Sequence, residues 1–109
     1  MTGVTVLHEA ETELWEAVQF YEGRCAGLGL DFAKEIRAAV ESIQQFPNRW
    51  PAREDGTRRY LIHRFPYFVV YIVHRGHVWI IAFAHCKRKP GYWSGRAAKT
   101  SARRKWRRK

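Results

Sequence analysis

Apolar residues are densest between Arg58 and Tyr92, where Val, Ile, Phe, Tyr and Trp recur at the frequency typical of β-strands. Three runs carry this pattern, at residues 58–65, 67–74 and 77–85. Pro66 separates the first two runs, and proline suits a tight corner because its φ is fixed and it has no backbone N–H. Gly76 lies between the last two runs and can adopt the positive φ of a two-residue hairpin turn. The stretch predicts three consecutive antiparallel strands.

The two turns also predict which residues lie opposite one another. With a two-residue loop before His77, Ile72 lies opposite Trp79. Further along the same pair of strands, Phe68 lies opposite Phe83. With a corner at Pro66, Arg59 lies opposite Ile72. Opposite residues share a face, so one face, which we expect to carry helices, holds Tyr60, Ile62, Tyr67, Val69, Tyr71, Val73, Val78, Ile80, Ala82 and Ala84. The other face has an apolar centre and a basic margin, and it holds Arg59, Leu61, His63, Phe68, Val70, Ile72, Trp79, Ile81, Phe83 and His85.

A helical pattern precedes the predicted sheet and follows a short strand at residues 3–8. The first helix has apolar residues at intervals of three and four, namely Ala10, Leu14, Ala17, Val18 and Tyr21. Most of its acidic residues fall on the opposite side, and they are Glu9, Glu11, Glu13, Glu16 and Glu22. Gly27 and Gly29 mark a corner between two helices. The second helix begins near Leu30 or Asp31 and ends before Pro47, because the residue preceding a proline leaves the α region.

The order β-α-α-β-β-β predicts an α+β domain with a helical hairpin packed on one face of a mainly antiparallel sheet. A chain of 109 residues is long enough for one hydrophobic core. We expect a single domain at residues 1–96 and a basic C-terminal tail at residues 97–109.

The net charge of +10 is unevenly distributed. Eight basic residues and no acidic residue occur between positions 96 and 109, namely Arg96, Lys99, Arg103, Arg104, Lys105, Arg107, Arg108 and Lys109. Such a segment implies an anionic partner, either nucleic acid or an acidic protein. A solvated tail without a dedicated partner is the alternative.

Other features narrow the class of protein. No apolar run approaches the roughly 20 residues of a membrane span, and the N-terminus becomes acidic too early for a signal peptide. We therefore expect a cytoplasmic protein with no membrane partner. Cys25 and Cys86 are not in a metal-binding or redox spacing, so we expect no metal site and no cofactor.

Several short motifs occur in a fixed order up to about residue 96. They are A-x3-L-x2-A-x3-Y from Ala10, GLGLDF from Gly27, P-x2-W-P from Pro47, RFPYFVVY from Arg64, AFAH from Ala82 and KR-x-PGYW-x2-R from Lys87. In this order and spacing they resemble the RelE/ParE superfamily of toxins from bacterial type II toxin–antitoxin systems, also called plasmid stabilisation proteins. The resemblance implies the RelE/ParE-like fold and an acidic cognate antitoxin that forms a hetero-oligomer with the toxin and neutralises it.

The superfamily implies two alternative targets. RelE-like members cut messenger RNA on the ribosome, whereas ParE-like members inhibit DNA gyrase and need no catalytic residues. Phe68 follows Tyr67 here, where RelE-like enzymes have an arginine, and apolar Leu61 and Ile62 occupy positions where basic residues are expected. The sequence therefore favours a growth-inhibiting toxin with a ParE-like, gyrase-directed or unassigned target. The alternatives are a ribosome-dependent mRNA endonuclease (mRNA interferase) and a non-toxic basic nucleic-acid-binding module.

An endonuclease of this kind needs groups that move protons and cations that stabilise phosphate charge. By the resemblance, the candidate catalytic residues are His85, Tyr92 and Arg64, and the candidate nucleic-acid-binding residues are Arg59, Lys87, Arg88 and Arg96. Structural roles are the alternative. His85 can end a strand with its nitrogens satisfied by the backbone or by Tyr92, and Arg64 can brace the turn against an acid of the first helix. The second sheet face can be a groove for the antitoxin.

Overall fold

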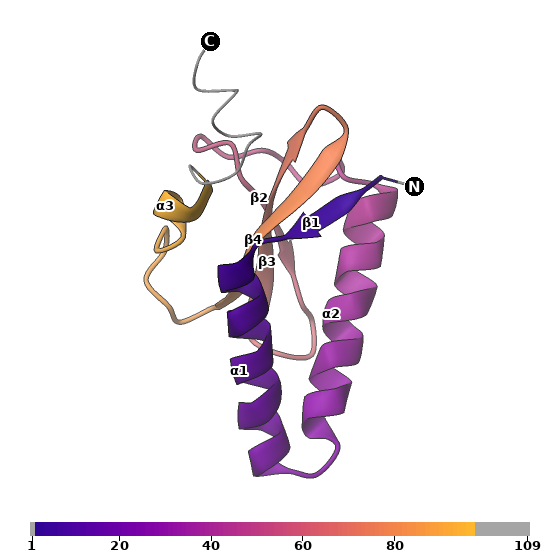
Figure 1. Cartoon of the computed structure of the whole chain (residues 1–109), viewed down its shortest axis with the longest axis vertical. Helices are drawn as coiled ribbons and strands as arrows, with labels where there is room; N and C mark the ends of the chain where they lie inside the picture. Colours follow the sequence, from indigo (N-terminus) through magenta and orange to yellow (C-terminus); the bar gives the residue numbers. More distant parts are fainter. Residues whose placement is uncertain (1, 98–109) are drawn as a thin grey trace.

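The computed structural model of the chain describes residues 2–97. Its elements follow the predicted order, with one short helix added at the end (Figure 1). They are β1 (Val4–Val6), α1 (His8–Arg24), α2 (Leu28–Gln45), β2 (Arg58–Leu61), β3 (Tyr67–His74), β4 (His77–His85) and α3 (Ser94–Ala97). The basic segment expected at residues 97–109 lies, apart from Ala97, outside the described residues.

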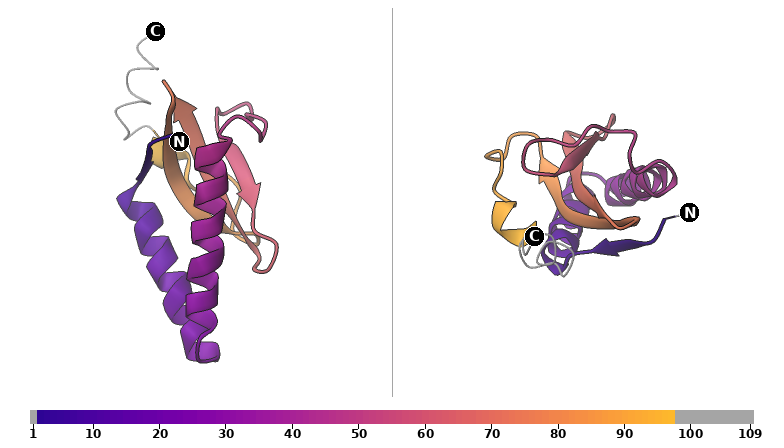
Figure 2. Two further views of the ribbon diagram at one scale, coloured as in Figure 1. Left: turned by 90° about the vertical axis from the view of Figure 1, so that its right-hand side faces the viewer. Right: turned by 90° about the horizontal axis from the view of Figure 1, so that it is seen from above.

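The helices and strands form the predicted α+β architecture. The sheet order is β1-β4-β3-β2, with β1 parallel to β4 at one edge and the other pairs antiparallel. Helices α1 and α2 cover one face of the sheet (Figure 1). Helix α3 lies beside the sheet, on the side of α1 that points away from α2 (Figures 1 and 2). The main core fills the space between the helical hairpin and the sheet. No helix within residues 2–97 combines the length and apolarity of a membrane span.

Strand β2 is shorter than predicted because the corner after it is wider than a two-residue turn. The Ile62 N–H donates a 2.9 Å hydrogen bond to the Tyr67 carbonyl oxygen, so the corner includes the residues between them. His63 and Arg64 therefore lie in an exposed loop rather than in a strand. As a result Arg59 pairs with Val70, and the predicted pairing of Arg59 with Ile72 is wrong.

A β-bulge shifts the register between the two central strands. Near the hairpin the pairing is as predicted, with His74 opposite His77 and Ile72 opposite Trp79. The next pairs are Tyr71 with Ile80 and Val70 with Ala82, so Ile81 is an extra residue on β4. Phe68 consequently lies opposite Ala84, and the predicted pairing of Phe68 with Phe83 is wrong.

The bulge also exchanges the two faces of β4 beyond Ile81, because an extra residue inverts the alternation of side chains. Ala82 and Ala84, predicted to lie under the helices, instead pack on the other face beneath Trp93. Phe83 joins the core under the helices. The predicted second face is therefore covered in part, and Trp93 is only 1% exposed. Small alanines make room for this large ring.

The corner between α1 and α2 depends on two glycines. Gly27 has a φ of 87°, which a residue with a side chain rarely adopts. The Glu22 carboxylate accepts hydrogen bonds from the N–H groups of Gly27 (2.8 Å) and Gly29 (3.0 Å). A Cβ on Gly29 would lie 2.5 Å from the Val18 carbonyl oxygen, so the helices approach closely only because this position has no side chain.

We predict that Gly29→Ala lowers the free energy of unfolding by about 1–3 kcal/mol, because the methyl group overpacks the contact between the helices. Gly23→Ala is the matched control. Gly23 lies in α1, and a Cβ added there would have nothing within 4 Å, so this change should raise stability by about 0.4–1 kcal/mol. Urea denaturation of both variants checks the prediction, and equal effects would contradict it.

Candidate functional site

The structure separates the predicted site residues into three places. His85, Arg88 and Tyr92 line one pocket beside α1. Arg64 lies in the loop after β2, and Arg59 lies on the opposite face of the sheet, against Trp93. The remaining two, Lys87 and Arg96, do not line the pocket but bond to residues that do.

The pocket has a volume of about 170 Å³ and lies between α1 and the end of β4. It is lined by Glu13, Glu16, Ala17, Phe20, Tyr67, Phe83, His85, Arg88 and Tyr92. Tyr67 pairs with His85 across the ladder, and their ring centroids are 5.1 Å apart. The bulge is what brings His85 to this side of the sheet. The predicted grouping of His85 with Arg59 and His63 on one face is therefore wrong.

Glu13 of α1 is the centre of the polar contacts next to the pocket. Its Oε1 accepts a 3.0 Å hydrogen bond from the Phe83 N–H and lies 2.9 Å from Arg96 Nη1. Its Oε2 accepts hydrogen bonds from Tyr92 Oη (2.6 Å) and Arg96 Nη2 (2.9 Å). The side chains of Glu13 and Arg96 are only 12% and 18% exposed. These contacts join the first helix, the bulged strand and the C-terminal end of the described chain.

The contacts of Glu13 and Arg96 replace the strand pairing that the edge of β4 lacks beyond the end of β1. This strand pairs with β4 only as far as Ile80, whose carbonyl oxygen accepts a hydrogen bond from the Leu7 N–H. Beyond that point β4 has no strand of the described chain on its outer edge. Arg96 donates a 3.2 Å hydrogen bond to the Ile81 carbonyl oxygen, and Glu13 accepts from the Phe83 N–H. The ion pair thus satisfies backbone groups that would otherwise cost free energy when buried.

Sequence reasoning did not identify Glu13. Its spacing groups it with the acidic residues on the outer side of the first helix, yet its side chain is largely buried. The only sequence signal is position, since Glu13 lies between the apolar residues Ala10 and Ala17 of the buried stripe. Periodicity alone does not separate a buried acid from a solvated one on the border of that stripe.

Tyr92 is held as a hydrogen-bond donor. Burial, and then the hydrogen bond to Glu13, raise the pKa of its phenol well above the usual value of 10. The Arg88 guanidinium lies 3.9 Å from the centre of the Tyr92 ring and covers it. A phenol that already donates to a carboxylate is not available as a proton donor to a leaving group.

His85 is also constrained by a backbone contact. Its Nδ1 accepts a 3.0 Å hydrogen bond from the Lys87 N–H, so the proton of the neutral ring is on Nε2. This agrees with the alternative in which the backbone satisfies the histidine at the end of the strand. In this tautomer His85 can donate a hydrogen bond but cannot accept a proton at Nε2. Tyr92 bonds to Glu13 and not to His85.

The two other predicted arginines make separate contacts. Arg64 lies 3.1 Å from Asp31 of α2, so it braces the loop against the second helix rather than the first. Both side chains are exposed, and such a pair contributes at most about 1 kcal/mol. Arg59 lies with its guanidinium 5.3 Å from the Phe68 ring centre and 5.0 Å from that of Trp93. Burial, and then the nearby Arg53, lower the pKa of Arg59.

The arrangement around Glu13 is typical of a structural ion pair next to a small binding pocket. Among the described lining residues, the remaining carboxylate is that of Glu16, which is exposed at the surface of α1. Within the described residues, no group of three His, Cys, Asp or Glu side chains could hold a metal ion. The pocket offers hydrogen-bond donors from His85 and Arg88 rather than a base beside an acid.

Comparisons with known proteins identify the family and the fold. Residues 4–90 match the family model described as ParE toxin of type II toxin-antitoxin system, parDE. No curated protein matches the chain in sequence. Among solved structures, the chain is similar to one described as the chromosomal ParDE TA system from P. aeruginosa, with a TM-score of 0.68 and 20% identity. The similarity covers 80% of this chain and 98% of that chain, and at this identity it shows a shared fold.

We predict that Glu13→Ala lowers the free energy of unfolding by about 3 kcal/mol, because it leaves Arg96 and the Phe83 N–H without their partner. Glu16→Ala removes a carboxylate three residues further along the same helix. It should change stability by no more than about 0.5 kcal/mol, since Glu16 is exposed. Chemical denaturation distinguishes the two, and a Glu13 variant as stable as the Glu16 variant would contradict the proposed role.

The raised pKa of Tyr92 predicts a loss of stability at alkaline pH. Its phenol ionises near pH 10 in the unfolded chain but at higher pH in the folded protein. Its contribution is therefore complete below pH 10 and is lost as the pH rises through the folded pKa, with a slope of about 1.4 kcal/mol per pH unit. Tyr92→Phe should make the curve of stability against pH less steep above pH 10. An unchanged slope in denaturation measurements would show that Tyr92 does not have this shift.

Proposed function

Because the chain belongs to the ParE toxin family of type II toxin–antitoxin systems, we propose that it arrests growth by binding a target rather than by cutting RNA. By the resemblance to ParE-like toxins, the target is DNA gyrase. The protein acts in the cytoplasm, where that target is found. No cofactor takes part in this mode of inhibition.

The contacts of Glu13 are the observation that supports inhibition without catalysis. An endonuclease needs a group that accepts the proton of a ribose 2′-OH and another that protonates the leaving oxygen. Here Tyr92 and Arg96 are both bonded to Glu13. His85 accepts a backbone hydrogen bond at Nδ1. Tyr92 and Arg96 are therefore engaged in the fold, and His85 has no free nitrogen with which to accept a proton.

The distribution of charge supports an acidic antitoxin that binds the sheet side of the molecule. Residues 2–45, which form the helical hairpin, contain eight acidic and three basic residues. Residues 46–97, which form most of the sheet and its loops, contain two acidic and ten basic residues. An acidic partner is attracted to residues 46–97 and repelled by residues 2–45. The complex of toxin and antitoxin is then a hetero-oligomer held partly by this attraction.

A ribosome-dependent mRNA endonuclease is the second candidate function. It is favoured by the meeting of His85, Arg88 and Tyr92 around one pocket, since these include two predicted catalytic residues and one predicted phosphate-binding residue. In this case the His85 Nε2–H would donate a hydrogen bond to the leaving oxygen, and Arg88 would stabilise the phosphate charge.

We predict that controlled induction of the full chain stops thymidine incorporation before amino acid incorporation, because a blocked gyrase halts replication first. His85→Ala should arrest growth as effectively as the original chain. This change removes a pocket residue without affecting the Glu13 ion pair. Parallel pulse-labelling after induction is the measurement.

The opposite pattern would favour the endonuclease. Amino acid incorporation would then fall first, and His85→Ala would relieve the arrest. Co-expression with the gene product encoded beside the toxin serves as the control, since the cognate antitoxin should restore both kinds of incorporation.

A further inference from the structure

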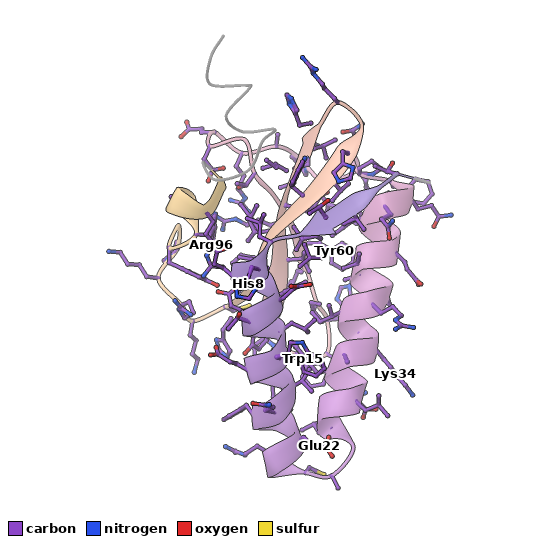
Figure 3. The ribbon with its side chains drawn as sticks, viewed as in Figure 1. His8, Trp15, Glu22, Lys34, Tyr60 and Arg96 are labelled. Carbon is purple, nitrogen blue, oxygen red and sulfur yellow. The ribbon has the colours of Figure 1, made fainter. Side chains whose placement is uncertain are left out.

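The helical hairpin contains a second, larger hollow that the proposed mechanism does not use. It is a groove of about 860 Å³ along the two helices, lined mainly by apolar residues. They include Leu14, Trp15 and Val18 of α1 and Leu30, Ala33, Ile36 and Val40 of α2. Trp15 lies on the side of α1 that faces α2 (Figure 3).

The groove leaves large apolar side chains in contact with water. Trp15 is 64% exposed and Leu30 is 59% exposed. A soluble monomer rarely exposes a continuous apolar surface of this kind unless a partner segment covers it. The groove therefore needs an occupant with at least one large apolar side chain.

The charges around the groove restrict that occupant. Glu11, Glu22 and Glu41 line it, and Arg37 is the only basic residue among the described lining residues. Glu11 and Glu41 are exposed, and no ion pair joins either of them to another described residue. An acidic segment is repelled by this rim, whereas a basic segment with an apolar side chain is complementary to it.

This chain contains such a segment. Residues 98–109, which lie outside the described part, carry seven basic residues, no acidic residue and one tryptophan, Trp106. The described chain ends at Ala97, next to α1, because Arg96 is bonded to Glu13 of that helix. Glu13 faces the small pocket, and Trp15 faces the groove on the other side of the same helix.

The segment is long enough to reach the groove. Half the circumference of a helix about 10–12 Å in diameter is roughly 17 Å, which about five or six extended residues can span. Twelve residues extend to about 40 Å. The first half of the segment can therefore pass around α1, and the second half, with Trp106 and most of the charges, can lie along the groove.

We propose that residues 98–109 bind in the groove of their own chain, with Trp106 against Trp15 and the basic residues against Glu11 and Glu41. This interaction covers the exposed apolar surface of the helical hairpin in the free protein. It goes beyond the proposed function and does not depend on which target the toxin has.

Limited proteolysis of the full chain tests the proposal. Trypsin cleaves after Lys and Arg, so residues 98–109 offer six sites before the final lysine, and intact-mass measurements follow their loss in protein made by cell-free synthesis. The double variant Glu11→Lys/Glu41→Lys should lose the segment faster, on the order of tenfold, because two attractive charge contacts become repulsive. Trp106→Ser should also speed its loss, because the apolar contact is removed.

Glu35→Lys/Glu54→Lys is the matched control. It makes the same change in net charge, but neither residue lines the groove, so cleavage should be as slow as in the original chain. Circular dichroism checks that each variant is folded. Equal cleavage rates in all four proteins would overturn the proposal. The groove would then be a binding site for a different protein. Protection that increases with protein concentration would also overturn it, because the occupant would then be the segment of a second copy.

Discussion

The buried carboxylate of Glu13 connects the parts of this protein that are furthest apart in the sequence. It accepts hydrogen bonds from Tyr92, Arg96 and the Phe83 backbone, and through them it joins α1, β4 and α3. A carboxylate that is largely buried must be paired. Here the ion pair with Arg96 also satisfies backbone groups at the edge of β4, beyond the point where β1 ends. The position of α3 beside the sheet follows from these contacts.

The bulge at Ile81 determines which residues of β4 line the pocket beside α1. One extra residue brings Phe83 and His85 to the side of α1 and sends Ala82 and Ala84 to the other face. Trp93 then packs on the alanines, and the chain that follows it brings Arg96 to Glu13. The residues that resemble a catalytic set are thus assembled by structural requirements, which accords with the proposed inhibition without catalysis.

Opposite charges on the two sides of the molecule are the basis of the two binding interactions proposed above. The hairpin is acidic and the sheet with its loops is basic, so an acidic antitoxin and a basic segment are directed to different surfaces. Both surfaces can be occupied in the same molecule. The strength of either attraction should fall with added salt, because exposed charges are screened.

The sequence by itself determined the order of the elements, the two central strands, the helical hairpin and the family. The elements follow from signals that are local in the chain, namely apolar periodicity and the placement of glycine and proline, whereas the family follows from the order and spacing of the short motifs. Only the tertiary structure decided that β1 lies parallel at the edge, that His85 and Arg59 lie on opposite faces and that Glu13 is buried. The reason is physical. A bulge of one residue, and an ion pair between positions 13 and 96, depend on contacts between distant parts of the chain, and periodicity within one element does not record such contacts.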